Sequence, residues 1–174
     1  STFQPKGVVL RHRQVLSNLA QMYRVFNRGE RVRVAGWIPF HHDMGLVGHL
    51  FTVLYESGFG VFMQPASFLA RPALWLSAIG EYNANSAAAP TFAFEHCCRK
   101  IQSAEPFDLS CWKHAYVGSE TVSPDVLNRF HAKFADAGFD RNSFKPVYGL
   151  AEVTLLAAGG SMGFAELDQF TKQK

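Results

Sequence analysis

The sequence has few cysteines, no long apolar run and little net charge, and each of these excludes a class of protein. The three cysteines are odd in number, two of them are adjacent and no CxxC occurs, so neither a disulfide framework nor a zinc site is expected. No apolar run reaches the roughly 18 residues of a membrane-spanning helix, and no signal peptide is visible. The net charge of +3 is too small and scattered to indicate a nucleic-acid partner. We therefore expect reduced thiols and a cytoplasmic location.

The 174 residues have a globular composition, 48% hydrophobic and 18% charged, and a regular alternation of segment types. Some segments carry apolar residues at helical spacing, and others are short apolar runs that end at proline or glycine. Strands are predicted at 8–10, 32–38, 60–63, 86–89, 114–117 and 146–147, and helices at 13–26, 46–55, 72–82, 91–101 and 123–134. This alternation predicts an α/β fold with βαβ crossovers and a largely parallel sheet.

Polar and glycine-containing segments follow three of the predicted strands. They are His41-His42-Asp43, Gly118-Ser119-Glu120 and the stretch from Tyr148 to Glu152. In parallel sheets, ligands bind beside the carboxyl ends of the strands. The sequence therefore predicts that these three segments border one site.

The chain opens with STFQPKG (residues 1–7), which combines hydroxyls, a lysine and a glycine ahead of an apolar run. Backbone N–H groups and hydroxyls of such a turn can bind phosphate oxygens, and the lysine adds a positive charge. The stretch is not a Walker loop, because it lacks GxxxxGK[ST]. Taken alone, a solvated surface turn explains it at least as well.

Two clusters invite a chemical reading that their spacing disfavours. Adjacent His41 and His42 point to opposite faces of an extended segment and cannot easily share a metal ion. His96, Cys97 and Cys98 fall on a predicted helix, where buried inert thiols are the simpler interpretation.

The segment from Tyr148 to Glu152 leaves two interpretations open. Its ring and carboxylate suit a nucleobase and Mg²⁺, and equally a packed tyrosine at the start of a helix.

Taken together and in order, five motifs resemble the adenylate-forming enzymes, and more narrowly the fatty acyl-AMP ligases. They are STFQPKGV (1–8), WIPFHHDMGL (37–46), APTFAF (89–94), GSE (118–120) and YGLAEVTLL (148–156). They are similar to that family's phosphate loop, acyl-site segment, pocket wall, adenosine turn and adenine- and metal-binding motif. The resemblance implies an incomplete portion of an adenylate-forming large domain. We expect residues 1–160 to be part of an AMP-binding domain and residues 161–174 to be a tail continuing into a further portion.

The resemblance also implies how ATP and Mg²⁺ are held. The implied nucleotide-binding residues are Ser1, Thr2, Lys6, Gly7, Gly118, Ser119, Glu120, Tyr148 and Gly149. Lys6 would neutralise phosphate charge, Tyr148 would stack on adenine and Glu152 would hold Mg²⁺. Lys6, His42 and Glu152 are thereby the implied catalytic residues.

On the acyl side, the implied substrate-binding residues are His42, Met44, Gly45, Phe92 and Phe94. The implied reaction converts a fatty acid and ATP into acyl-AMP. The acyl group then passes to the phosphopantetheine thiol of an acyl carrier protein in lipid or polyketide biosynthesis. Two alternatives stay open. One is a fatty acyl-CoA synthetase, and the other is an adenylation-like domain that binds a lipid or a partner without catalysis, because Phe3 stands where the phosphate loop usually has glycine.

Overall fold

The computed structural model of the chain describes residues 7–26 and 29–160. Within them the strands are β1 (Arg33–Gly36), β2 (Phe59–Phe62), β3 (Ser86–Ala89), β4 (His114–Val117), β5 (Phe144–Gly149) and β6 (Leu156–Gly159). They form one sheet in the order β2-β1-β3-β4-β5-β6. Neighbouring strands pair in parallel except β6, which runs antiparallel to β5. The predicted α/β fold with a largely parallel sheet is thus confirmed.

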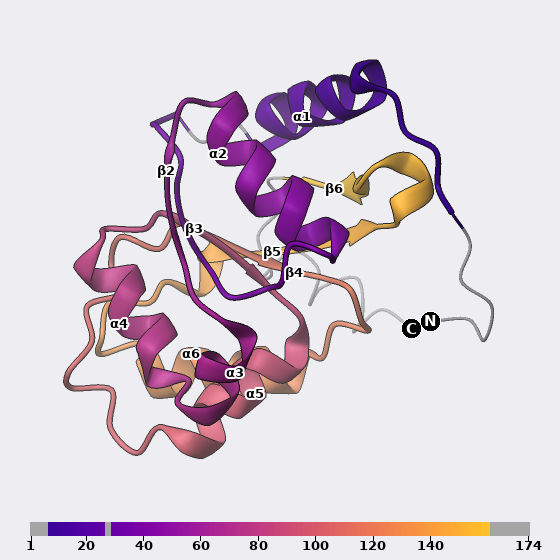
Figure 1. The fold of residues 1–174 in the computed structure, drawn as a ribbon. Coiled ribbons are helices and arrows are strands. Elements are labelled where there is room, and N and C mark those ends of the chain that lie inside the picture. The colour runs from indigo at the N-terminus through magenta and orange to yellow at the C-terminus, as the bar shows by residue number, and fades with distance from the viewer. Residues whose placement is uncertain (1–6, 27–28, 161–174) are drawn as a thin grey trace.

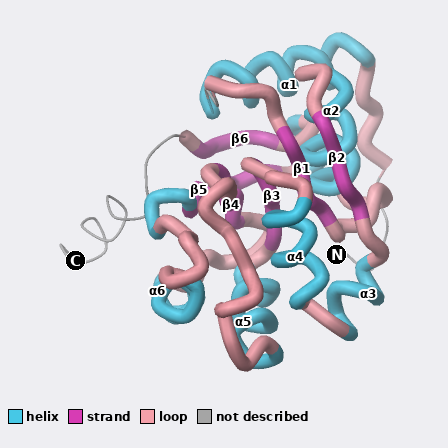
Figure 2. The backbone as a smooth tube through the Cα atoms, turned by 90° about the vertical axis from the view of Figure 1, so that its left-hand side faces the viewer, coloured by secondary structure: helices cyan, strands magenta, loops and turns pink. Residues whose placement is uncertain are grey.

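Helices cover both faces of this sheet (Figure 1). They are α1 (His12–Phe26), the π-helix η1 (Met44–Phe51), α2 (Thr52–Tyr55), α3 (Pro65–Ala70), α4 (Ala73–Glu81), α5 (Thr91–Lys100) and α6 (Pro124–Phe134), with short 3₁₀ turns η2 (Arg141–Ser143) and η3 (Ala151–Val153). In Figure 1, α1 and α2 lie on one side of the strands, and α3 to α6 lie on the other. Figure 2 shows the same three layers from the side.

Aromatic rings fill the layer between the sheet and helices α4 to α6. Phe94 is fully buried there, stacked on Trp112 at 6.1 Å and edge-on to Phe130 at 5.1 Å between ring centroids. Trp75 and Phe144 complete the group around Phe94. Such large rings dominate the burial energy of a core, and the many phenylalanines of the sequence are therefore structural here.

Several local predictions need correction. Residues 8–10 form no strand, and the Val9 side chain is 88% exposed, because no strand lies beside it to pair with. The sequence pattern missed α3 and β6. Thr91 does not cap α5 with its own side chain, because its hydroxyl donates to the carbonyl of Thr121. The predicted helix at 46–55 exists, but it begins as a π-helix at Met44.

Among the described residues, no helix is both long enough and apolar enough to cross a membrane.

Candidate functional site

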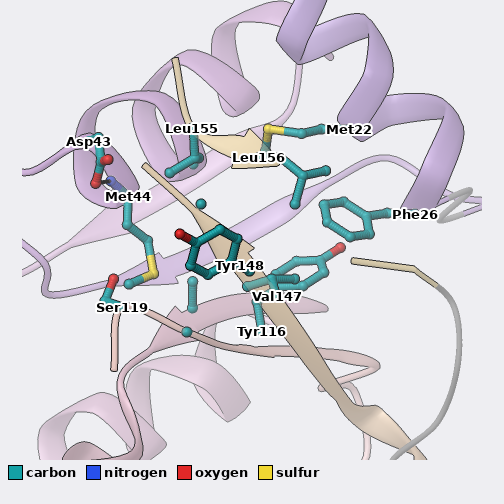
Figure 3. Close-up of a pocket in the computed structure, with 14 residues that line it drawn as sticks. Met22, Phe26, Asp43, Met44, Tyr116, Ser119, Val147, Tyr148, Leu155 and Leu156 are labelled. Atoms are coloured by element: carbon teal, nitrogen blue, oxygen red, sulfur yellow. Dashed lines mark hydrogen bonds between the residues drawn. The ribbon is translucent and has the colours of Figure 1, made fainter. Parts of the chain in front are cut away.

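A mostly apolar pocket lies between α1, η1 and the ends of four strands (Figure 3). We call it the apolar pocket. It is lined by Met22, Phe26, Asp43, Met44, Gly48, Ala88, Tyr116, Gly118, Ser119, Val147, Tyr148, Gly149, Leu155 and Leu156. All three polar segments that follow predicted strands therefore contribute to one site, as the topology of a parallel sheet requires.

The apolar pocket is narrow in this conformation, with an enclosed volume of about 50 Å³. That space suits a water molecule or two, whereas ligand sites usually enclose several hundred Å³. Met22 and Met44 form part of its wall, and methionine side chains change rotamer easily.

His42 and Asp43 form an ion pair at the rim, with Nδ1 and Oδ1 2.9 Å apart. The hydrogen bond to Asp43 raises the pKa of His42, and the same bond lowers the pKa of Asp43. The Met44 N–H lies 3.1 Å from His42 Nδ1 and 2.7 Å from Asp43 Oδ1. Because an Nδ1 that donates to Asp43 cannot also accept, the Met44 N–H donates to Asp43. His42 itself does not line the pocket; it lies beside Asp43, which does, and 44% of the His42 side chain is exposed.

The segment from Gly118 to Glu120 makes a tight turn at the pocket wall. A Cβ on Gly118 would lie 2.7 Å from the carbonyl oxygen of Val147, so only glycine fits there. Ser119 has a φ of 67°, a left-handed conformation that is uncommon outside glycine. Glu120 turns away from the pocket, and its Oε1 accepts the N–H of Phe92 at 2.6 Å. The Glu120 carboxylate therefore caps the N-terminus of α5 and anchors the turn.

The segment from Tyr148 to Thr154 folds back on itself at the pocket. A Cβ on Gly149 would collide with the carbonyl oxygen of Leu155, which accepts the N–H of Leu150. Thr154 has φ 82° and ψ −59°, a strained conformation for a β-branched residue. Figure 3 shows the Tyr148 ring between Met44 and Tyr116, and the residue is 65% exposed. The turn thus presents an aromatic face to solvent.

Glu152 lies in a second, polar recess between α1 and this turn. Arg13, Asn18 and Thr154 also line the recess, whose volume is about 540 Å³. A site that offers Mg²⁺ one carboxylate, with phosphate oxygens and water as its other ligands, matches the ion's usual coordination. The described residues contain no group of three or more potential metal ligands.

Some predicted site residues lie elsewhere. Phe94 does not line the apolar pocket, because its side of α5 faces the aromatic core. Phe92 is 43% exposed and packs edge-on to Trp37, 5.8 Å away between centroids. Gly45 is buried under the chain: its Cα approaches the carbonyl oxygens of residues 38 and 39 so closely that a Cβ would collide with them. Gly7 is exposed and borders no neighbour. Ser1, Thr2 and Lys6 lie outside the described residues.

Sequence reasoning missed a buried asparagine that ties α1 to the far edge of the sheet. The Asn18 Nδ2 donates to the carbonyl of Leu156 at 2.9 Å, and the N–H of Leu156 donates to Asn18 Oδ1 at 3.0 Å. The side chain thus pairs with Leu156 as a neighbouring strand would. A signal was present, since Asn18 interrupts the apolar face of α1 beside Leu19 and Met22.

The cysteines are not activated. Burial raises the pKa of Cys97 far above its usual value, and it raises that of Cys98 to about 11. Neither thiol forms thiolate near neutral pH, so the expectation of inert thiols agrees with their surroundings.

The fold and the pocket define an α/β domain that binds its ligand beside the carboxyl ends of a parallel sheet. Comparison with known proteins narrows this class. A model of the AMP-binding enzyme family matches residues 1–173. The chain belongs to that family.

Two named relatives are similar to the chain. It is 40% identical over 163 residues to the medium-chain-fatty-acid–[acyl-carrier-protein] ligase TtuA of Teredinibacter turnerae, covering 92% of this chain and 25% of TtuA. It is 36% identical over 190 residues to the long-chain-fatty-acid–AMP ligase FadD32 of Mycobacterium marinum, covering 100% of this chain and 30% of FadD32.

The chain is also similar to a solved structure. The fatty acyl-adenylate ligase of L. pneumophila, in complex with acyl adenylate and pyrophosphate, superposes with a TM-score of 0.89 at 39% identity. The match covers 92% of this chain and 29% of that protein. The chain thus spans between a quarter and a third of the relatives described here.

Proposed function

We propose that the protein containing this chain activates a fatty acid with ATP, forming acyl-AMP, and passes the acyl group to an acyl carrier protein. The observation that carries the proposal is the apolar pocket, whose wall includes the exposed Tyr148 and Asp43, the ion-pair partner of His42. An apolar channel, a positive charge and a stacking surface suit an acyl chain, its carboxylate and adenine respectively. The likeness to TtuA and to the L. pneumophila ligase supports this assignment.

In the proposed reaction a carboxylate oxygen attacks the α-phosphorus of ATP. The new bond joins that oxygen to phosphorus, the bond from the α-phosphorus to its bridging oxygen breaks, and pyrophosphate leaves. No protein nucleophile is needed, so catalysis depends on positioning and on charge neutralisation. His42 is the proposed positive group for the carboxylate, because its hydrogen bond with Asp43 raises its pKa and so favours the protonated imidazole.

Mg²⁺ would supply charge neutralisation at the phosphates, and Glu152 is the residue of this chain that would hold it. The carboxylate is exposed and shares the polar recess with the guanidinium of Arg13. That combination suits a phosphate chain with its metal ion. Lys6, Ser1 and Thr2 remain proposed phosphate-binding residues on the sequence resemblance alone.

On the nucleotide side, the Tyr148 ring is the proposed platform for adenine. The glycines at 118 and 149 let the backbone pass close to the carbonyl oxygens of Val147 and Leu155 respectively, which a side chain would prevent. Ser119 lines the same wall, whereas Glu120 contributes by fixing the turn rather than by touching the nucleotide.

The test uses the full-length protein with ATP, Mg²⁺ and radiolabelled fatty acids of 6 to 18 carbons, with coenzyme A, a carrier protein or neither. Acyl-AMP that persists beside coenzyme A and is consumed by the carrier protein supports the proposal. Formation of acyl-CoA identifies the synthetase alternative. No adenylate at any chain length favours the alternative without catalysis.

Two matched variants test whether Glu152, in the polar recess, is the metal ligand. Glu152→Gln is expected to lower acyl-AMP formation on the order of 10²-fold, since it removes the proposed metal ligand. Glu81→Gln changes an exposed carboxylate at the end of α4 and is expected to leave the rate unchanged. Equal rates for both variants would exclude Glu152 as the ligand.

A further inference from the structure

The parallel sheet is open at one place, between β1 and β3. These strands pair only at Val34 and Ser86, whereas β3 and β4 pair at all four positions of β3. Continuing the register by two residues sets Gly36 opposite Ala88, and the ladder would then join the Ala88 N–H to the carbonyl of Ala35. Neither group makes that bond. Each is bonded instead to a side chain.

His49 of η1 occupies the opening from one face of the sheet. Its Nε2 accepts the N–H of Ala88 at 3.2 Å, and its ring lies against Gly36 so closely that a Cβ there would be 2.5 Å from Nδ1. The imidazole is 1% exposed. It therefore stands in the ladder position between Gly36 and Ala88, and Gly36 leaves the space that it fills.

Trp75 of α4 occupies the opening from the other face. Its indole Nε1 donates to the carbonyl of Ala35 at 3.1 Å, and the side chain is fully buried. The two side chains thus replace one backbone hydrogen bond with two, and they hold β1 and β3 apart at the end that borders the apolar pocket. A buried backbone group left without a partner is costly, so both bonds resist closure of the gap.

The opening matters because Ala88 is part of the apolar pocket. Ala88 forms its wall from β3, while Met44 and Gly48 form its wall from η1, the helix that carries His49. The bond from Ala88 to His49 is therefore a direct brace between two walls of the pocket. Loss of this bond would free the β3 wall to move against the η1 wall.

We propose that His49 is a positioning residue for the acyl chain: its imidazole wedges β1 from β3, braces Ala88 against η1 and so sets the width of the apolar pocket. The proposal rests on the proposed function, which makes that pocket the acyl site. His49 acts as neutral imidazole with its proton on Nδ1, since Nε2 accepts. Burial lowers the pKa of His49 to about 4, in keeping with a neutral ring at physiological pH.

The test replaces His49 in the full-length protein and separates substrate positioning from general stability. His49→Leu keeps the bulk and loses the acceptor. His49→Gln places Oε1 the same number of bonds from Cα as Nε2 and can accept the Ala88 N–H. His49→Leu is expected to raise KM for the fatty acid about tenfold, with KM for ATP and kcat within about twofold, and His49→Gln is expected to restore KM.

Trp75→Phe is the matched control, because Trp75 bonds to Ala35 of β1 rather than to Ala88, so the brace between Ala88 and His49 stays in place. It is expected to lower the unfolding temperature without changing KM for the fatty acid. If Trp75→Phe raises KM as much as His49→Leu does, or if His49→Gln fails to restore it, the role is general stability and the proposal is overturned.

A measurement on the unmodified protein is independent of activity. The ¹³C and ¹⁵N shifts of the His49 ring report which nitrogen carries the proton, and amide exchange reports the protection of Ala88. A proton on Nε2, or an Ala88 amide that exchanges freely, contradicts the wedge. Absence of acyl-AMP together with a protected Ala88 and an Nδ1 proton would instead contradict the proposed function and leave the wedge standing.

Discussion

The pairing of Asn18 with Leu156 gives a stability prediction that can be worked from the structure. Asn18→Ala removes the partners of two backbone groups, the N–H and the carbonyl of Leu156, in a residue that is 6% exposed. A buried backbone group without a partner costs about 1–3 kcal/mol. Because Leu156 also borders the polar recess, water can reach part of the site, and we expect a total of about 2–3 kcal/mol.

Amide hydrogen exchange of the β6 residues tests this prediction, because β6 is where the two hydrogen bonds are lost. A loss of about 2–3 kcal/mol speeds exchange of the β6 amides by about 30–150-fold, if β6 opens before the rest of the sheet. Ser17→Ala is the matched control, because Ser17 is exposed on the same helix and lies beside the altered residue. Exchange in β6 within about threefold of the unmodified protein would refute the reasoning, as would an equal effect of Ser17→Ala.

Two further predictions concern the pocket rim. Gly45→Ala drives a Cβ into the carbonyl oxygen of Pro39 and is expected to destabilise the domain by about 1–3 kcal/mol in urea unfolding. Gly48→Ala meets only side-chain atoms, those of Leu155 and Met44, and should cost less; equal costs would contradict the backbone clash. His42 should titrate by NMR above its ordinary pKa of 6.5, while Asp43 should titrate below 3.8. The stabilisation from His42 is then full below pH 6.5 and lost as pH rises through the raised pKa, and that from Asp43 is lost as pH falls through its lowered pKa. Titration of His42 at or below 6.5 would contradict the ion pair.

The sheet was predictable wherever a strand is bounded by strong local signals. Residues 86–89 and 114–117 match β3 and β4, because Pro90 and Gly118 end apolar runs that must be buried on both faces. Residues 8–10 have an equally strong β pattern and form no strand, because strand propensity expresses itself only beside a partner. The reverse holds for β6, whose short alanine- and glycine-containing segment is a strand only through its pairing with β5.

The site was predictable in its position more than in its walls. Parallel topology alone brings the segments at His42, Gly118 and Tyr148 to one edge. The local sequence does not specify which buried neighbours a helical side chain packs against. Phe94, expected in the pocket wall, therefore proved to lie in the aromatic core instead. His49 was not predictable at all, because its role depends on a gap between two strands that no local pattern encodes.

The bond between Asn18 and Leu156 joins residues 138 positions apart, and this separation has a consequence for synthesis. The N-terminal helix leaves the ribosome long before the strand that completes its hydrogen bonds and covers its inner face. Closing so long a loop is slow relative to forming local structure. Until Leu156 emerges, α1 lacks the strand that pairs with Asn18, and the part of the apolar pocket wall formed by Leu155 and Leu156 is added only then.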